Sequence, residues 1–206
     1  MTVAVRSYRF SPPKLIAGVL CLDFINTVSY RGDTHDRGER LTSYSELIAW
    51  ARPAGIVGAG VAASLLKRAD RNPGLASAVV VQAIEFREAL ARLLLTTRGR
   101  AAGDLAIVND RLAAAPARSR LLSRNGDYFW AGDAKGKNLA EPIYPVVWSA
   151  ADLLASERLR LVRSCGDERC GWFFLDTSPS GRRRWCSMKE CGNRAKARRF
   201  YHANGP

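Results

Sequence analysis

The stretch Cys165-Gly-Asp-Glu-Arg-Cys170, followed fifteen residues later by Cys186-Ser-Met-Lys-Glu-Cys191, decides the fold of the C-terminal part of this chain. Both pairs have the spacing Cys-x4-Cys, and Gly166 and Gly192 lie where a backbone has to bend around a metal. Structural zinc takes four thiolates in a tetrahedron at about 2.3 Å each, so a protein must bring two short-range pairs together. The spacing therefore predicts one zinc ion bound by Cys165, Cys170, Cys186 and Cys191.

Two disulfides are the alternative for these four cysteines, with three ways to pair them. The sequence does not indicate secretion, because the residue before Cys21 is the bulky Leu20, where signal processing needs a small residue, and the apolar run soon meets Asp23 and Asn26. Cytosolic thiols stay reduced, which favours the metal. A zinc ion with four cysteine ligands has no open coordination position, so we expect a structural metal and not a hydrolytic one.

The residues between and after the two pairs predict a small α/β module. Residues 172–177 read as a strand, 178–181 as a turn and 182–185 as a returning strand, and a short helix follows Cys191. We expect Trp172, Phe174 and Trp185 to form the core of this hairpin. A metal-binding turn, a hairpin and a helix together resemble the treble-clef type of zinc finger.

The basic residues of the chain are concentrated in the same region. The formal net charge is +13, and residues 158–206 carry 12 of the 32 basic but only 4 of the 19 acidic residues, a net +8. Such an excess attracts polyanions, although a solubilising surface is the alternative. Arginine suits phosphate oxygens and guanine edges especially well. The candidate DNA-binding residues are Arg182, Arg183, Arg184, Arg194, Lys196, Arg198 and Arg199.

The rest of the chain, residues 1–157, predicts a mainly α-helical domain with one β-hairpin, so the protein is α+β overall. Helices are expected over 12–28, from the capping box Ser43-Tyr-Ser-Glu46 to Ala51, and over 61–70, 75–97, 105–114 and 140–155. Asn125-Gly126 between two apolar stretches predicts a tight hairpin turn. The composition becomes basic near residues 156–163, which places the boundary of a second domain at 158–206.

Three polar residues interrupt the apolar stretch Leu22-Asp-Phe-Ile-Asn-Thr-Val28. Asp23, Asn26 and Thr27 share one face of the expected helix, and buried polar groups need partners. Those partners are either a ligand, with Arg31 nearby, or backbone groups of the adjoining loop. Both alternatives stay open at this point.

Two longer motifs resemble known families. The run from Trp185 to Tyr201 contains Cys191-Gly-Asn-Arg194 and closely resembles the CGNR zinc-finger family, which Cys170-Gly-Trp-Phe-Phe-Leu-Asp-Thr177 also fits. Leu22-Asp-Phe-Ile-Asn-Thr27 and Leu47-Ile-Ala-Trp50 are similar to the ABATE domain of stress-induced transcription regulators. The resemblance covers nearly the whole chain. It implies bacterial DNA binding, with the four cysteines as zinc ligands.

We therefore expect a transcriptional regulator whose zinc module contacts DNA and whose N-terminal domain senses a signal or dimerises. A single finger offers few base contacts, so a homodimer is expected if binding is sequence-specific. No run approaches the roughly 20 apolar residues of a membrane-spanning helix, so a cytoplasmic protein without a membrane partner is expected.

Two other classes of function are weighed against this expectation. An enzyme is disfavoured, because the chain has no Gly-rich phosphate loop and only two histidines; no catalytic residue is predicted, and a site near Asp23 is the alternative. A finger that binds RNA or protein is the other alternative, with Trp172, Phe173, Phe174 and Trp185 stacking on unpaired bases.

Overall fold

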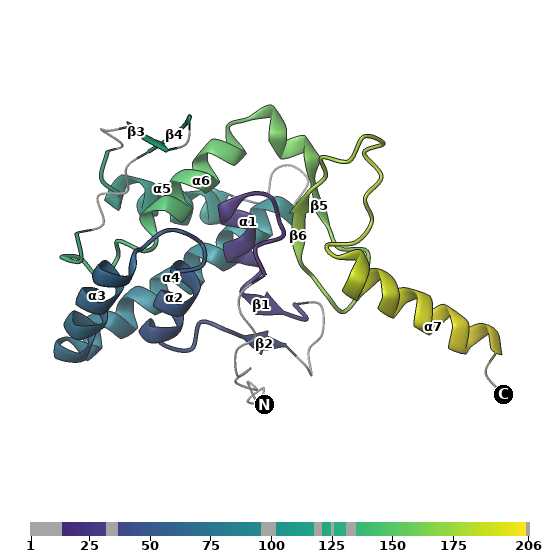
Figure 1. Cartoon of the computed structure of the whole chain (residues 1–206), viewed down its shortest axis with the longest axis horizontal. Coiled ribbons are helices and arrows are strands. Elements are labelled where there is room, and N and C mark those ends of the chain that lie inside the picture. The colour runs from purple at the N-terminus through teal and green to yellow at the C-terminus, as the bar shows by residue number, and fades with distance from the viewer. Residues whose placement is uncertain are drawn as a thin grey trace. The chain divides into compact units, whose positions relative to one another are not determined.

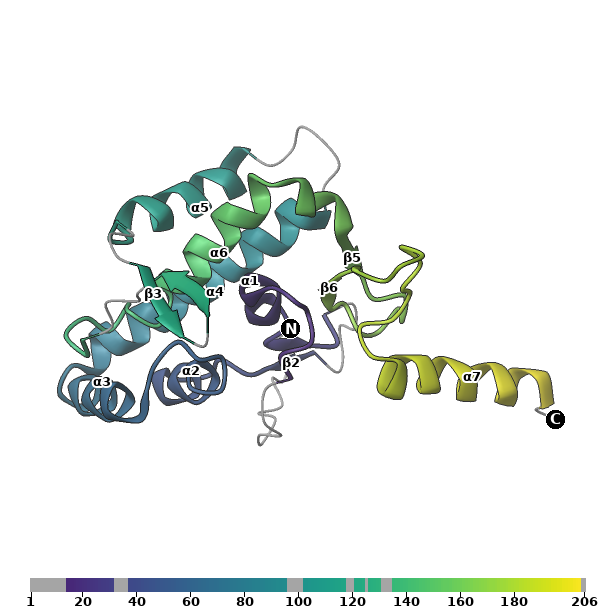
Figure 2. The same cartoon turned by 45° about the horizontal axis from the view of Figure 1, so that its top comes forward.

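The computed structural model describes residues 14–31, 37–95, 102–117, 121–124, 126–130 and 135–204. Contacts divide the chain into two compact units (Figures 1 and 2). Unit 1 consists of Met1–Arg40 and Leu153–Pro206, and unit 2 of Leu41–Asp152. The boundary predicted from composition, between residues 157 and 158, lies inside unit 1 and stays a prediction about domain organisation.

Unit 2 is helical, with one hairpin. Its elements are α2 (Tyr44–Ala51), α3 (Ala59–Arg71), α4 (Pro73–Leu95), α5 (Ala102–Ala114), β3 (Leu121–Arg124), β4 (Asp127–Trp130) and most of α6 (Tyr144–Leu154). Helix α4 contacts α2, α3 and α5. Val79, Ala83, Phe86 and Leu90 are buried along it, which confirms the steps of three and four seen in the sequence.

Local signals fix the ends of several of these elements. The Ser43 hydroxyl accepts a hydrogen bond from the Glu46 amide at 3.3 Å, so the predicted N-cap of α2 is confirmed. Arg124 pairs with Asp127 across the hairpin, which leaves a two-residue turn at the predicted place, and Gly126 has φ 87°. Pro145 occupies the first turn of α6, where its missing N–H costs no hydrogen bond.

The N-terminal helix of unit 1 is much shorter than predicted. Helix α1 covers only Leu20–Ile25, and the expected residues 12 and 13 lie outside the described part of the chain. Gly18 has φ 79°, and the Ala17 carbonyl accepts a hydrogen bond from the Leu175 amide at 2.8 Å. This segment therefore pairs with a distant strand instead of continuing the helix, and Ala17 is buried there while Leu15 stays exposed.

A small antiparallel pair follows α1. Strand β1 (Val28–Ser29) pairs with β2 (Gly38–Glu39), so the region 31–40, predicted as a loop, contains a short strand. The Arg31 amide donates to the carbonyl of Cys170 at 3.3 Å. Segments 14–31 and 37–40 thus lie against the C-terminal module of the same unit.

The C-terminal module has a hairpin and a helix, as predicted, but the strands are different. Strand β6 (Phe173–Leu175) pairs with β5 (Val162–Ser164), which precedes the first cysteine, and residues 182–185 form no strand. The short turn from Cys165 to Cys170 brings β5 and β6 together directly. Helix α7 (Asn193–Asn204) follows a single π-turn at Met188–Gly192, and a 3-10 turn (Glu157–Leu161) precedes β5.

Within the described residues, none of the helices has both the length and the apolar character required to cross a membrane.

Candidate metal centre and basic surface

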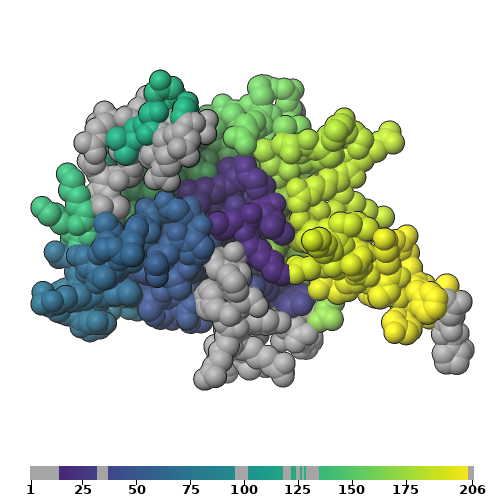
Figure 3. Space-filling model, viewed as in Figure 1, coloured from purple at the N-terminus to yellow at the C-terminus, as the bar shows by residue number. Residues whose placement is uncertain are grey.

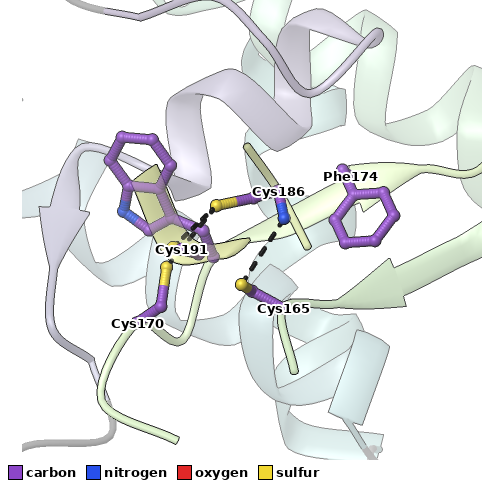
Figure 4. Close-up of a cluster of buried hydrophobic side chains, with 6 residues drawn as sticks. Cys165, Cys170, Phe174, Cys186 and Cys191 are labelled. Atoms are coloured by element: carbon purple, nitrogen blue, oxygen red, sulfur yellow. Dashed lines mark hydrogen bonds between the residues drawn. The ribbon is translucent and has the colours of Figure 1, made fainter. Parts of the chain in front are cut away.

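The four predicted zinc ligands come together in unit 1. Their sulfur atoms all lie within 4.8 Å of one another, and Cys186 Sγ is 3.6 Å from Cys170 Sγ and 3.5 Å from Cys191 Sγ (Figure 4). Tetrahedral zinc–thiolate bonds of about 2.3 Å require sulfur atoms roughly 3.8 Å apart, so the residues fit a zinc ion. All five cysteines are free thiols, so the disulfide alternative is wrong.

The centre is buried, and each cysteine changes the pKa of its neighbours. The four cysteines are only 2–8% exposed. Contacts with Cys165 raise the pKa of Cys170 and Cys186, while hydrogen bonding from Cys170 lowers the pKa of Cys165. Four adjacent thiolates need a cation between them, and zinc supplies it with no coordination position left for substrate. The zinc is therefore a structural cofactor.

Local backbone geometry places each ligand. The Cys165 amide donates to the Trp172 carbonyl at 2.7 Å and closes the turn between β5 and β6. The Gly166 amide donates to the Arg184 carbonyl at 2.8 Å, and a Cβ on Gly166 would lie 3.1 Å from that oxygen. A Cβ on Gly192 would lie 2.4 Å from Met188 Sδ. At Gly166 the close approach is to a backbone oxygen and leaves little room for a side chain, whereas at Gly192 the nearest atom belongs to the flexible side chain of Met188.

Aromatic side chains form the core around the sulfur atoms. Trp172, Phe173 and Phe174 are buried, and Trp185 packs against the same cluster; Figure 4 shows Phe174 beside the cysteines. The Trp172 indole N–H donates to the Val28 carbonyl at 2.7 Å. These buried rings are therefore structural and do not offer faces for stacking on unpaired bases.

Two family models match the sequence. Residues 18–157 match ABATE, described as "Putative stress-induced transcription regulator", and residues 161–203 match the CGNR zinc finger. The chain belongs to the ABATE family. A comparison with curated proteins found no match.

The ABATE region includes the four side chains predicted as a ligand site, and the structure gives each a backbone partner. Asn26 exchanges two hydrogen bonds with Phe173, donating from Nδ2 at 2.8 Å and accepting at Oδ1 at 2.9 Å. Asp23 accepts from the Ala17 amide at 2.9 Å. Thr27 donates to the Phe24 carbonyl and Arg31 to that of Ile25. These contacts favour the structural alternative; the ligand role stays a prediction.

Asp23 is held in an environment that disfavours its charged form. Burial raises the pKa of its carboxyl group to about 6, although the backbone amides of Ala17 and Ile16 partly oppose the shift. The side chain fixes the segment before α1, and that segment pairs with β6. Asp23 therefore holds the segment just before the ABATE region, which pairs with strand β6 of the CGNR finger.

The seven predicted DNA-binding residues of the CGNR finger fall into two groups. Arg182, Arg184, Lys196 and Arg199 are exposed. Arg183 is partly buried and donates to the carbonyls of Trp185 and Cys186 at 3.0 and 2.5 Å. Arg194 and Arg198 form ion pairs with Asp167 at 2.6 and 2.9 Å.

Asp167 is the functional residue that sequence reasoning missed. It lies inside the first Cys-x4-Cys turn, its side chain is fully buried, and two guanidinium groups contact it. Hydrogen bonds from Arg194 and Arg198 outweigh the effect of burial and hold its pKa below the usual range. The only signal in the sequence was an acidic residue between two cysteines in a strongly basic segment.

Proposed function

We propose that this ABATE-family chain regulates transcription by binding duplex DNA through the exposed cations of its CGNR finger. The observation that carries the proposal is the group of exposed basic side chains on one zinc-fixed module, in which two of the four acidic residues, Asp167 and Asp176, are buried and only Glu168 and Glu190 are exposed. The exposed cations are Arg182, Arg184, Lys189, Lys196 and Arg199. Phosphate contacts of this kind supply most of the affinity for nucleic acid.

Helix α7 is the element that suits a groove. Its twelve residues span about 18 Å at 1.5 Å per residue, and a major groove is about 12 Å wide. The helix extends away from the cysteine turns in Figures 1 and 2, and its yellow surface is largely open in Figure 3. Lys196 and Arg199 are exposed on it, so they are the proposed contacts to DNA from this helix.

Single-stranded nucleic acid is the second candidate partner, and one observation favours it. Phe200 and Tyr201 are 64% and 72% exposed near the end of α7, with ring centroids 6.0 Å apart in an edge-to-face arrangement. Exposed aromatic rings beside cations form stacking surfaces for unpaired bases. A competition between duplex DNA and single-stranded RNA of equal length distinguishes the two candidates.

The same proposal includes features that follow from a regulatory role. A homodimer would place two fingers on two half-sites and supply the base contacts that one finger lacks. A signal or small-molecule effector would act through the ABATE region. We also propose that the protein acts in the cytoplasm, without a catalytic residue and without a cofactor other than zinc.

A salt titration of DNA binding tests the proposal. The protein is the zinc-loaded full chain, and the variant Lys196→Gln/Arg199→Gln is compared with Lys67→Gln/Arg68→Gln, which removes two exposed cations from α3. If Lys196 and Arg199 each meet a phosphate, the logarithmic salt slope of the α7 variant falls by about 1.8. The α3 variant should keep the wild-type slope.

Equal slopes in all three proteins, with zinc retained, would contradict the proposal that α7 contacts DNA. An equal decrease in both variants would show that binding depends on overall charge and not on the finger.

A further inference from the structure

The carboxylate of Asp167 connects the two halves of the zinc module. Its Oδ2 accepts from Arg194 Nε at 2.6 Å and its Oδ1 from Arg198 Nη2 at 2.9 Å. The Asp167 carbonyl also accepts from the amide of the ligand Cys170 at 2.8 Å. One buried residue of the first cysteine turn thus holds two consecutive turns of α7.

Arg194 carries the connection on to the metal site. Its Nη2 atom donates to Cys191 Sγ at 3.1 Å, while its Nε atom donates to Asp167. The planar guanidinium therefore bridges a carboxylate from one cysteine pair and a thiolate from the other. A lysine has no such fork and cannot make both contacts in this geometry.

Tyr30, from the N-terminal segment, lies against the same guanidinium. The Arg194 guanidinium carbon is 5.6 Å from the centroid of the Tyr30 ring, and that of Arg169 is 5.7 Å away. Tyr30 has φ 53°, a left-handed conformation that bulky residues seldom adopt and that persists only where the surroundings enforce it. Arg194 is thus held by an aromatic ring, a carboxylate and a sulfur atom.

The charge of the centre explains why such a contact is useful. Zinc with four thiolates carries a formal charge of −2, and the four cysteines here are buried. A buried charge needs a partner, and groups that hydrogen-bond to metal ligands orient them and tune affinity. Arg194 donates directly to a ligand sulfur, and Asp167 fixes the guanidinium that does so.

We propose that Arg194 and Asp167 form the outer shell of the zinc site, in which Asp167 positions Arg194 and Arg194 stabilises the Cys191 thiolate and attaches α7 to the first cysteine turn. This role depends on zinc binding and not on the proposed DNA binding. Arg194 and Arg198 are then engaged by Asp167, which leaves Lys196 and Arg199 as the proposed DNA contacts from α7.

The test measures zinc affinity in the full-length chain, by competition with a chromophoric zinc chelator. The variants are Arg194→Gln, Arg194→Lys and Asp167→Asn, and Arg199→Gln is the matched control, since it removes the same charge from an exposed position of the same helix. Hydrogen–deuterium exchange of the α7 amides is followed in the same samples.

Loss of an outer-shell partner typically weakens metal affinity by about 10–100-fold. Arg194→Gln and Asp167→Asn should show a loss in that range and faster exchange in α7. Arg194→Lys should recover only part of the affinity, and Arg199→Gln should match the wild type in both measurements.

Three results would overturn the proposal. If Arg194→Gln has the same zinc affinity and the same α7 exchange rate as Arg199→Gln, Arg194 does not belong to the outer shell. If Asp167→Asn binds zinc with wild-type affinity, Asp167 does not position Arg194. Full recovery in Arg194→Lys would show that charge alone is needed, and not the bridge.

Discussion

Arg194 and Arg199 are arginines of the same helix, yet the structure gives them different surroundings. Arg199 is exposed, whereas Arg194 contacts Asp167 and Cys191. The difference comes from the position of one carboxylate, which lies 27 residues earlier in the chain. An arginine that an internal partner has already engaged has fewer N–H donors left for another ligand.

Asp23 gives a prediction about pH at this scale. Burial raises the pKa of its carboxyl group from the ordinary 3.8 to about 6, so the folded state binds the proton more tightly than the unfolded state does. Stability from this group is therefore greatest below about pH 4 and decreases as the pH rises to about 6, by up to about 3 kcal/mol. Asp23→Asn removes this titration.

The measurement is the free energy of unfolding of wild type and Asp23→Asn between pH 4 and pH 7, with excess zinc in both samples. We expect the variant to gain stability relative to the wild type as the pH rises through this window. A difference between the two proteins that stays constant from pH 4 to pH 7 would contradict the raised pKa of Asp23.

At the scale of secondary structure, strand β6 is the element on which unit 1 is built. It pairs with β5, packs against α1, and is joined by hydrogen bonds to two N-terminal residues. Leu175 donates to Ala17, and Phe173 exchanges two bonds with Asn26. The three-residue strand β6 thus connects the first cysteine turn to a segment that lies about 150 residues earlier in the chain.

Asn26→Ala tests that connection. The substitution leaves a buried N–H and a buried carbonyl of Phe173 without these partners, and each such loss costs about 1–3 kcal/mol. Denaturant unfolding should show a decrease of at least this size. Asn72→Ala is the control, because Asn72 makes one hydrogen bond at an exposed site and should change stability little. Equal effects of the two substitutions would refute the role of Asn26.

At the scale of the whole molecule, the family boundaries along the sequence do not coincide with the two compact units. The ABATE model covers residues 18–157, but the described residues 14–31 and 37–40 belong to unit 1 together with the CGNR finger. The finger is therefore completed by residues that the family boundaries assign to the ABATE region. Zinc binding and the fold of the N-terminal segment are consequently linked.

Removal of zinc from the full chain should unfold part of unit 1 and leave unit 2 folded. Structural zinc contributes an apparent ~10–16 kcal/mol to isolated finger peptides, so a chelator should unfold the cysteine turns and release α1 and β6. Hydrogen–deuterium exchange should accelerate on the order of tenfold or more in α1 and β6 and stay unchanged in α4. An α1 that keeps its protection without zinc would show that the segment folds independently of the finger.

The sequence by itself determined the features that depend on local spacing. Two Cys-x4-Cys pairs fixed the ligands, the period of Val79, Ala83, Phe86 and Leu90 fixed α4, and Asn125-Gly126 fixed a hairpin turn. Each of these signals lies within a few residues or in a repeated cysteine pattern. The physical preference that produces the structure is therefore visible in the local sequence.

Only the tertiary structure decided which distant segments pair and which charges stay exposed. Residues 14–19 belong to the predicted helix 12–28, but Ala17 pairs with Leu175 of β6, and residues 182–185 were predicted to pair with β6, but β5 takes that place. Asp167 has no local signal for its two arginines, since they lie 27 and 31 residues away. Pairing energy between remote segments depends on the folded geometry, which local spacing does not encode.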